Sequence, residues 1–389
     1  MDGPTTEAPL YMDEPITETL FCMDGPTTEA PLHMDGPTSE ARIRMDGPTT
    51  EAPFYMDGPI AEAPFTWMVL PLILGNYRAI SLIINHLQSN GKLPSNDQTL
   101  IGFITFDSSV HFYNFQGNSC EPQMIVSLST EDIIIPVEDN LLVNVRQRKE
   151  DIASFLTLLP TKFKESKKRY CAFGAALQAA QKVIGFTGGR VSMFLSQLPN
   201  KGCGTLYNRE QEANSTGALG WKELAPAEFY KTLATTFAAQ DTTVDLFLLS
   251  REYCDLASLS CIPRTTCGSI YFYPGFHHIQ DVGQVEKLQK EFQHYLTRPI
   301  GTKALLRICS TEGLILPSPC RSSQLPCSDL LHIPVISPDT VFTVQMEVKE
   351  KLVEWPFVTF QSCLLYTSGT GQCYSVTVVA ASEKKRLAQ

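Results

Sequence analysis

Apolar residues recur at two different periods along the chain, and each period predicts a different kind of element. In 76–87 and 284–296 they are spaced by three and four residues, which predicts helices with one apolar face. Leu100–Phe106 is an uninterrupted apolar run, typical of a strand buried on both faces, and 110–115 is expected to form its hairpin neighbour. Helices and strands are therefore expected within one domain.

Helical and strand-like segments alternate through the middle of the chain. Alternation of this kind requires crossover connections, because parallel strands cannot be joined by tight turns. It predicts a mainly parallel sheet covered by helices. Helices are expected at 148–159, 173–183, 228–239 and briefly near 255, and strands at 191–195, 244–249 and 269–273.

After residue 298 the apolar period changes to two. Apolar and polar residues alternate in 342–348, 358–366 and 374–378, and the helical spacing stops. Strict alternation is typical of antiparallel strands that bury one face and leave the other in water. This part of the chain is expected to be a β-sandwich or barrel.

The first 66 residues are six copies of one eleven-residue unit, approximately Met-Asp-Gly-Pro-Thr-Thr-Glu-Ala-Pro followed by two variable residues. Because Gly and Pro recur in nearly every copy, a continuous helix is excluded and disorder with polyproline character is expected. The block could be an array of weak docking sites. Its near-identical copies carry no reactive chemistry, which favours a repeat expansion without a selected role or a mispredicted first exon.

Net charge separates this block from the rest of the chain. The chain has 31 basic and 41 acidic residues, and the block holds 2 and 13 of them, which leaves 29 and 28 for the remainder. A near-neutral remainder argues against nucleic acid as a ligand, because phosphate binding needs clustered Lys and Arg. The longest apolar run, 65–74, is about half of the ~20 residues that a spanning helix needs. The protein is expected to be soluble or peripheral at a membrane.

The N-terminus and the cysteines indicate the cytosol. The first residues have neither the basic nor the apolar region of a signal peptide. The 12 cysteines are spread along the chain instead of forming a short, dense framework. They are therefore expected to be reduced thiols.

No group of residues in the sequence has the identities and spacing of a known catalytic or metal-binding motif. The histidines and cysteines lack metal-ligand spacings, no Cys-x-x-Cys pair occurs, and there is no Gly-x-Ser-x-Gly elbow. Asp107-Ser108-Ser109 is superficially similar to the start of the cation site of von Willebrand A domains. It follows the second expected strand, however, and His111 stands where that motif has its second serine. A hairpin turn is expected there, and a metal-dependent enzyme is an alternative without a visible ligand set.

Several longer stretches match one known family, in the family's order, across 95–380. They resemble the trunk of the COPII inner-coat subunits, and specifically the A and B paralogues of the cargo adaptor. The matching stretches are Ile-Gly-Phe-Ile-Thr-Phe-Asp-Ser-Ser-Val-His-Phe-Tyr (101–113), Leu-Leu-Val-Asn-Val (141–145), Val-Asp-Leu-Phe-Leu-Leu (244–249), Asp-Leu-Ala-Ser-Leu (255–259), Val-Glu-Lys-Leu-Gln-Lys (285–290), Tyr-Leu-Thr-Arg (295–298) and Leu-Leu-Tyr-Thr-Ser (364–368).

The resemblance implies a von Willebrand A-like doubly wound sheet, the trunk, followed by an antiparallel β-sandwich. On this chain it places disordered repeats at 1–66, the trunk at 67–298, an incomplete β-sandwich at 299–382 and a basic tail at 383–389. It implies a non-enzymatic, cytoplasmic COPII coat component in transport from the endoplasmic reticulum to the Golgi. Such a subunit forms a heterodimer with its sister inner-coat subunit, binds cytosolic sorting signals of membrane cargo and lies peripherally on endoplasmic reticulum exit sites and vesicles.

One residue of the family's cargo site is matched. That site holds acidic signals with basic residues, which suits arginine because a guanidinium can form two hydrogen bonds with one carboxylate. Two of the basic residues lie in an Arg-Ile-Arg stretch after the trunk helix. Here Arg307 matches the first and Cys309 replaces the second. Arg307 is the expected cargo-binding residue, and a charge at a strand edge is the alternative.

The chain also departs from the family pattern. The zinc ribbon before the trunk is replaced by the repeats, so no cofactor is expected. The first trunk strand is only faintly visible in 67–75, no basic pair follows the turn at 371–374, and the later helical and gelsolin-like domains are missing. A non-functional truncated paralogue or a gene-model fragment is therefore an alternative.

Overall fold

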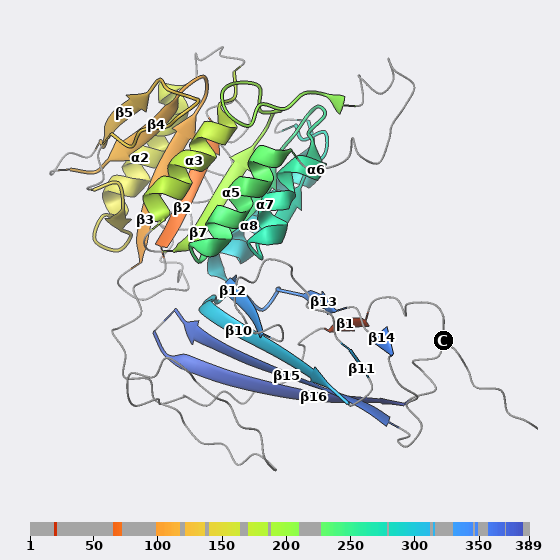
Figure 1. Cartoon of the computed structure of the whole chain (residues 1–389). Coiled ribbons are helices and arrows are strands. Elements are labelled where there is room, and N and C mark those ends of the chain that lie inside the picture. The colour runs from red at the N-terminus through yellow and green to blue at the C-terminus, as the bar shows by residue number, and fades with distance from the viewer. Residues whose placement is uncertain are drawn as a thin grey trace, which may run out of the picture.

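The computed structural model contains a helix-covered sheet and an antiparallel sheet (Figure 1). The predicted helix at 76–87, the repeats apart from 19–21 and 65–66, and the basic tail apart from Glu383 lie outside the described residues. The structure describes residues 19–21, 65–71, 99–116, 121–136, 140–163, 170–185, 188–209, 227–277, 280–311, 314–315, 330–344, 347–348, 357–369 and 371–383.

The larger sheet has eight strands and is parallel at its centre. The strand order is β5-β4-β3-β2-β7-β8-β9, with β6 paired to β3. β2, β3, β7, β8 and β9 pair in parallel, whereas β4, β5 and β6 join through antiparallel pairs. The predicted mainly parallel sheet is confirmed. The strands are β2 (Phe65–Pro71), β3 (Leu100–Phe106), β4 (Val110–Asn114), β5 (Gln123–Ser127), β6 (Val143–Asn144), β7 (Gly189–Leu195), β8 (Thr242–Leu248) and β9 (Ile270–Phe272).

The first trunk strand, which is only faintly visible in the sequence of 67–75, is present as β2 and begins two residues earlier, at Phe65. β2 is complete and lies between β3 and β7, pairing in parallel with both. Its sequence, Phe-Thr-Trp-Met-Val-Leu-Pro, is rich in aromatic and β-branched residues, and its only proline is the last residue, where it breaks no central pairing. The strand was obscured in the sequence because its first two residues, Phe65 and Thr66, coincide with the end of the sixth repeat.

Helices cover both faces of this sheet. Phe173 and Tyr230, from α3 and α5, belong to the buried cluster on one face. Phe155 and Phe292, from α2 and α8, belong to the cluster on the other face. Two covered faces define a doubly wound α/β sheet, so the predicted fold class is confirmed. The helices are α2 (Lys149–Lys162), α3 (Phe173–Ile184), α5 (Glu228–Ala239), α6 (Leu256–Leu259), α7 (Cys261–Thr265) and α8 (Val282–Thr297).

The second sheet follows α8 and is antiparallel, as the period-two pattern predicted. Its strand order is β12-β10-β15-β16, and two shorter antiparallel pairs, β11-β14 and β1-β13, accompany it. Ala304, Leu306 and Ile333 form the centre of its buried face. The strands are β10 (Gly301–Ser310), β11 (Leu314–Ile315), β12 (Leu330–Ile336), β13 (Phe342–Val344), β14 (Glu347–Val348), β15 (Phe357–Ser368) and β16 (Cys373–Glu383).

A three-residue strand, β1 (Thr19–Phe21), departs from the disorder predicted for the repeats, because it pairs with β13. The second repeat differs from the consensus at this point, since Thr19-Leu20 replaces the usual Ala-Pro. Without that proline every residue of the segment keeps a backbone N–H for pairing.

Candidate functional site

Arg307 lies in one of the two inner strands of the antiparallel sheet. It is in β10, opposite Cys363 of β15 and Leu330 of β12. The side chain is half-buried, and its Nε atom is buried with no hydrogen-bond partner among the described residues. A guanidinium donates hydrogen bonds and can bind a carboxylate through them, but the buried Nε is not a donor that a carboxylate of another molecule reaches.

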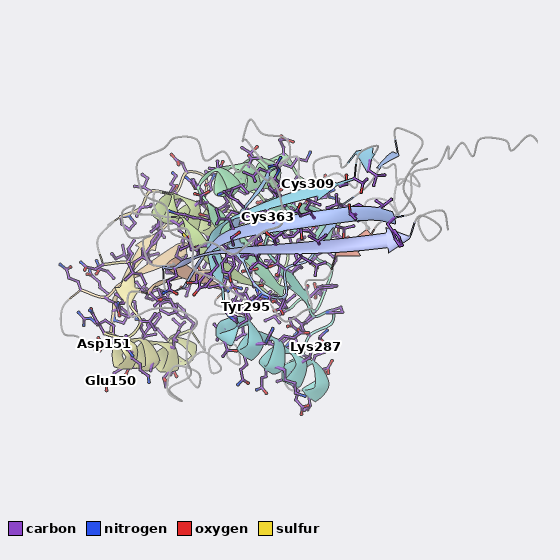
Figure 2. All side chains as sticks on the ribbon, turned by 90° about the horizontal axis from the view of Figure 1, so that it is seen from below. Glu150, Asp151, Lys287, Tyr295, Cys309 and Cys363 are labelled. Atoms are coloured by element: carbon purple, nitrogen blue, oxygen red, sulfur yellow. The ribbon has the colours of Figure 1, made fainter. Side chains whose placement is uncertain are left out.

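The sheet face that carries Arg307 is the one turned away from the buried cluster. Side chains alternate along a strand, so Arg307 and Cys309 share a face, while Leu306 points into the buried cluster. Cys363 lies on the same face, and Figure 2 shows Cys309 and Cys363 on neighbouring strands. The Thr377 hydroxyl of β16 donates to the Cys363 sulfur at 3.6 Å. Arg307 thus shares its face with thiols and a hydroxyl, and also with the apolar side chains of Leu305 and Leu330.

The structure places Arg307 and Cys309 where the resemblance expected them, on the strand that follows the trunk helix α8. Cys309 is opposite Gln361, and its thiol stands where the resemblance expects the second basic residue. The cargo-binding role of Arg307 stays a prediction. Sequence reasoning missed its cross-strand neighbour Cys363, because no local pattern reveals which strands pair.

The Asp107 turn is a hairpin between β3 and β4, as predicted. Asp107 Oδ1 accepts hydrogen bonds from the Ser109 backbone N–H and from the Ser109 hydroxyl, both at 3.0 Å. Asp107 and Ser109 are both buried. This carboxylate oxygen is therefore committed to the turn. Within the described ranges there is no group of three or more His, Cys, Asp or Glu side chains that could hold a metal.

A buried polar network extends from this turn along β4. The Ser109 hydroxyl lies 3.1 Å from His111 Nε2, and the Thr105 hydroxyl contacts both His111 Nδ1 at 3.2 Å and the Tyr113 hydroxyl at 2.7 Å. Burial raises the pKa of Tyr113, which keeps its hydroxyl protonated. Asp, His and Ser are all present, but each is at most 4% exposed and the Ser109 hydroxyl already serves Asp107. The network fixes the hairpin and offers no accessible nucleophile.

A second buried network crosses the centre of the larger sheet. Arg190 of β7 and Asp245 of β8 form an ion pair with an Nε–Oδ2 distance of 2.7 Å. The Tyr295 hydroxyl of α8 donates to the same oxygen at 2.9 Å, and the Arg190 guanidinium lies over the Tyr295 ring. The Ser269 N–H donates to the other carboxylate oxygen. The pair ties two strands to the helix that leads into the antiparallel sheet.

The two sheets are joined by charged contacts. Asp339, in the turn between β12 and β13, accepts from Arg298 Nη1 at 2.9 Å and lies 2.7 Å from His294 Nε2. His332 of β12 lies 3.6 Å from the carboxylate of Asp241, just before β8. Partial burial acts to raise the pKa of Asp339, but the bonds from Arg298 and His294 outweigh it, and the pKa falls below its ordinary value.

Asp339 is expected to make stability acid-sensitive. A carboxyl whose pKa falls on folding stabilises the folded state above its unfolded pKa, near 3.9. That stabilisation is lost as the pH drops through the lower folded value. Asp339→Asn is therefore expected to lose less unfolding free energy than the unsubstituted protein between pH 5 and pH 3, measured by urea denaturation. Equal acid losses in the two proteins would contradict this contribution.

The comparisons with known proteins point to one family. The sequence-family model of the Sec23/Sec24 trunk domain matches residues 78–296 of this chain. The protein transport proteins Sec24A and Sec24B of Homo sapiens are 46% and 44% identical to this chain over 280 and 287 residues, or 72% and 74% of the chain. The SEC24 A protein of Arabidopsis thaliana is 35% identical over 283 residues.

A solved structure agrees with these sequence matches. The crystal structure of the human COPII-coat protein Sec24c superposes with a TM-score of 0.72 at 26% identity, covering 84% of this chain and 44% of that chain. The chain spans about a quarter of the length of its curated relatives, 26% for Sec24A and 23% for Sec24B. Among the described residues, no helix is long and apolar enough to cross a membrane.

Proposed function

Because the chain belongs to the Sec23/Sec24 family, we propose that it is a COPII coat component in transport from the endoplasmic reticulum to the Golgi. The observation that carries the proposal is the trunk match over residues 78–296, together with the fold it shares with Sec24c. In this role the protein acts by binding other proteins and is not an enzyme. It works in the cytoplasm, peripherally on endoplasmic reticulum exit sites and COPII vesicles.

The proposed partners are a sister inner-coat subunit and the sorting signals of membrane cargo. The eight-stranded sheet supports a folded trunk, which pairing with a sister subunit requires, because its central strand β2 is paired on both sides. We propose that no metal is needed, since the sequence has no Cys-x-x-Cys pair to begin a zinc ribbon. The near-neutral charge of the globular part supports protein partners over nucleic acid.

A pull-down of the sister subunit by the purified full chain tests the proposal. We expect a complex that survives size-exclusion chromatography. A thermal scan on the same sample distinguishes this proposal from the alternative that the chain is a fragment that does not fold. The alternative predicts no cooperative unfolding transition. A cooperative transition without a complex would reject the coat role and leave the family membership intact.

Arg307 is proposed to bind acidic cargo signals. Replacing it with alanine is expected to weaken binding of an acidic cytosolic peptide by about tenfold, because a hydrogen bond to a charged group contributes about 1.5–3 kcal/mol. The affinity of the Arg307→Lys variant for the peptide is expected to lie between those of the unsubstituted protein and Arg307→Ala. Lysine keeps the charge but cannot form two parallel hydrogen bonds with one carboxylate. Fluorescence anisotropy with a labelled peptide measures the affinities.

Two controls accompany this measurement. Lys303→Ala removes an exposed positive charge from the same strand and is expected to change the affinity less than twofold. Cys309→Arg restores the second basic position and is expected to tighten binding. If Arg307→Ala and Lys303→Ala weaken binding equally, the peptide responds only to overall charge and Arg307 has no specific role.

A further inference from the structure

β16 is the outer strand of the antiparallel sheet. It pairs with β15 without interruption from Cys373 opposite Thr367 to Glu383 opposite Phe357. No described strand pairs with its other side, and Figure 1 shows it as the outermost arrow of the sheet. Among the described strands, its outward backbone groups thus have no partner.

The composition of β16 offers none of the usual protection of an edge. Natural edge strands carry charges, prolines or bulges that prevent pairing with another chain. β16 reads Cys-Tyr-Ser-Val-Thr-Val-Val-Ala-Ala-Ser-Glu, with one charge, at its last residue, and no proline. Its register with β15 has no bulge. An edge strand with a single charge at its end, no proline, no bulge and several β-branched residues is suited to strand addition.

Exposed apolar side chains occur on both faces of the strand. Val379 is 66% exposed and Val378 is 41% exposed. Neighbouring residues of a strand point to opposite faces, so a strand added alongside would cover both valines. Val378 lies on the same face as the buried Leu364, which makes the apolar face continuous up to the edge.

We propose that β16 is a self-pairing surface, to which a second copy of this chain adds its own β16 in antiparallel orientation. Pairing centred on Val378 places the two Val378 residues opposite each other and Thr377 opposite Val379. The charged Glu383 then faces Cys373 of the other copy, so no like charges meet along the strand. Two four-stranded sheets become one continuous sheet with an apolar seam.

The size of this contact sets its strength. A strand of eleven residues spans about 37 Å at ~3.4 Å per residue. One strand pair buries less than the roughly 1,200 Å² of a standard stable interface, so association is expected to be weak and reversible, at micromolar or higher concentrations. The inference concerns this sheet edge and is independent of the coat role.

Sedimentation of the full chain between about 5 and 200 μM tests the proposal. We expect a reversible monomer–dimer equilibrium, with amide hydrogen exchange in 373–383 slowing as the concentration rises. Val379→Lys is expected to weaken dimerisation by about tenfold, because the substitution acts on both copies and places charge in the seam. Far-UV circular dichroism establishes that the variant is folded.

Ile134→Lys is the matched control. Ile134 is 72% exposed and lies outside any strand, so this variant adds the same charge elsewhere and should dimerise like the unsubstituted protein. A chain that stays monomeric at 200 μM would overturn the proposal, and so would protection of 373–383 only when another protein is added. Equal dimerisation of the Val379→Lys variant would also overturn it.

Discussion

Replacing Arg190 with alanine is expected to lower the free energy of unfolding by about 3–5 kcal/mol, because it leaves the Asp245 carboxylate as an uncompensated buried charge. The Arg190 side chain is 8% exposed and the Asp245 side chain 2%. The Tyr295 hydroxyl and the Ser269 N–H still donate to Asp245, but neither carries a positive charge. Urea denaturation at pH 7 measures the loss.

The surface pair of Lys182 and Asp132 supplies the control. Their Nζ–Oδ1 distance is 3.0 Å, similar to the buried pair, but the side chains are 41% and 87% exposed. Lys182→Ala removes this pair and a hydrogen bond from Lys182 Nζ to Ile133 O, and is expected to cost about 1–2 kcal/mol. Adding Asp245→Asn to the Arg190→Ala protein should recover part of its loss by removing the stranded charge. Comparable losses for Arg190→Ala and Lys182→Ala would contradict the role of burial.

The elements were predictable wherever the apolar pattern was strong. Leu100–Phe106 forms β3 with the predicted boundaries, because seven apolar or small residues in a row leave one conformation that buries them all. The helix predicted at 173–183 is α3, one residue longer. The start of β2 was missed because a repeat boundary coincided with it, and the short edge strand β5 was missed because five residues give too little period to recognise.

The polar contacts were not predictable, because they depend on pairing between distant strands. Asp245 is the only charged residue of an otherwise uncharged strand. Because a buried carboxylate requires a polar or charged partner, the sequence alone indicates that Asp245 has one. That the partner is Arg190 follows only from the register of β7 with β8, in which Ser192 lies opposite Asp245. The neighbours of Arg307 also depend on strand register, since only the pairing of β10 with β15 brings Cys363 beside it.

Gly174→Ala is expected to destabilise the protein by about 3 kcal/mol, although glycine-to-alanine changes within helices ordinarily gain about 0.5–1 kcal/mol. Gly174 is buried near the start of α3, and a Cβ added there would lie 2.0 Å from the backbone oxygen of Cys203. That carbonyl cannot move cheaply. The Cys203 N–H donates to Thr130 O at 2.9 Å, and the next carbonyl, of Gly204, accepts from the Tyr230 hydroxyl.

Gly283 in the first turn of α8 is the matched control. A Cβ there would meet only Asp281 Oδ1, at 3.7 Å, so Gly283→Ala retains the propensity gain and is expected to stabilise by up to about 1 kcal/mol. The two variants thus make the same chemical change in two helices with effects of opposite sign. Thermal and urea unfolding measure both. Stabilisation of Gly174→Ala would mean that the Cys203 segment yields to the helix, and that α3 is not held as closely to it as the carbonyl distance indicates.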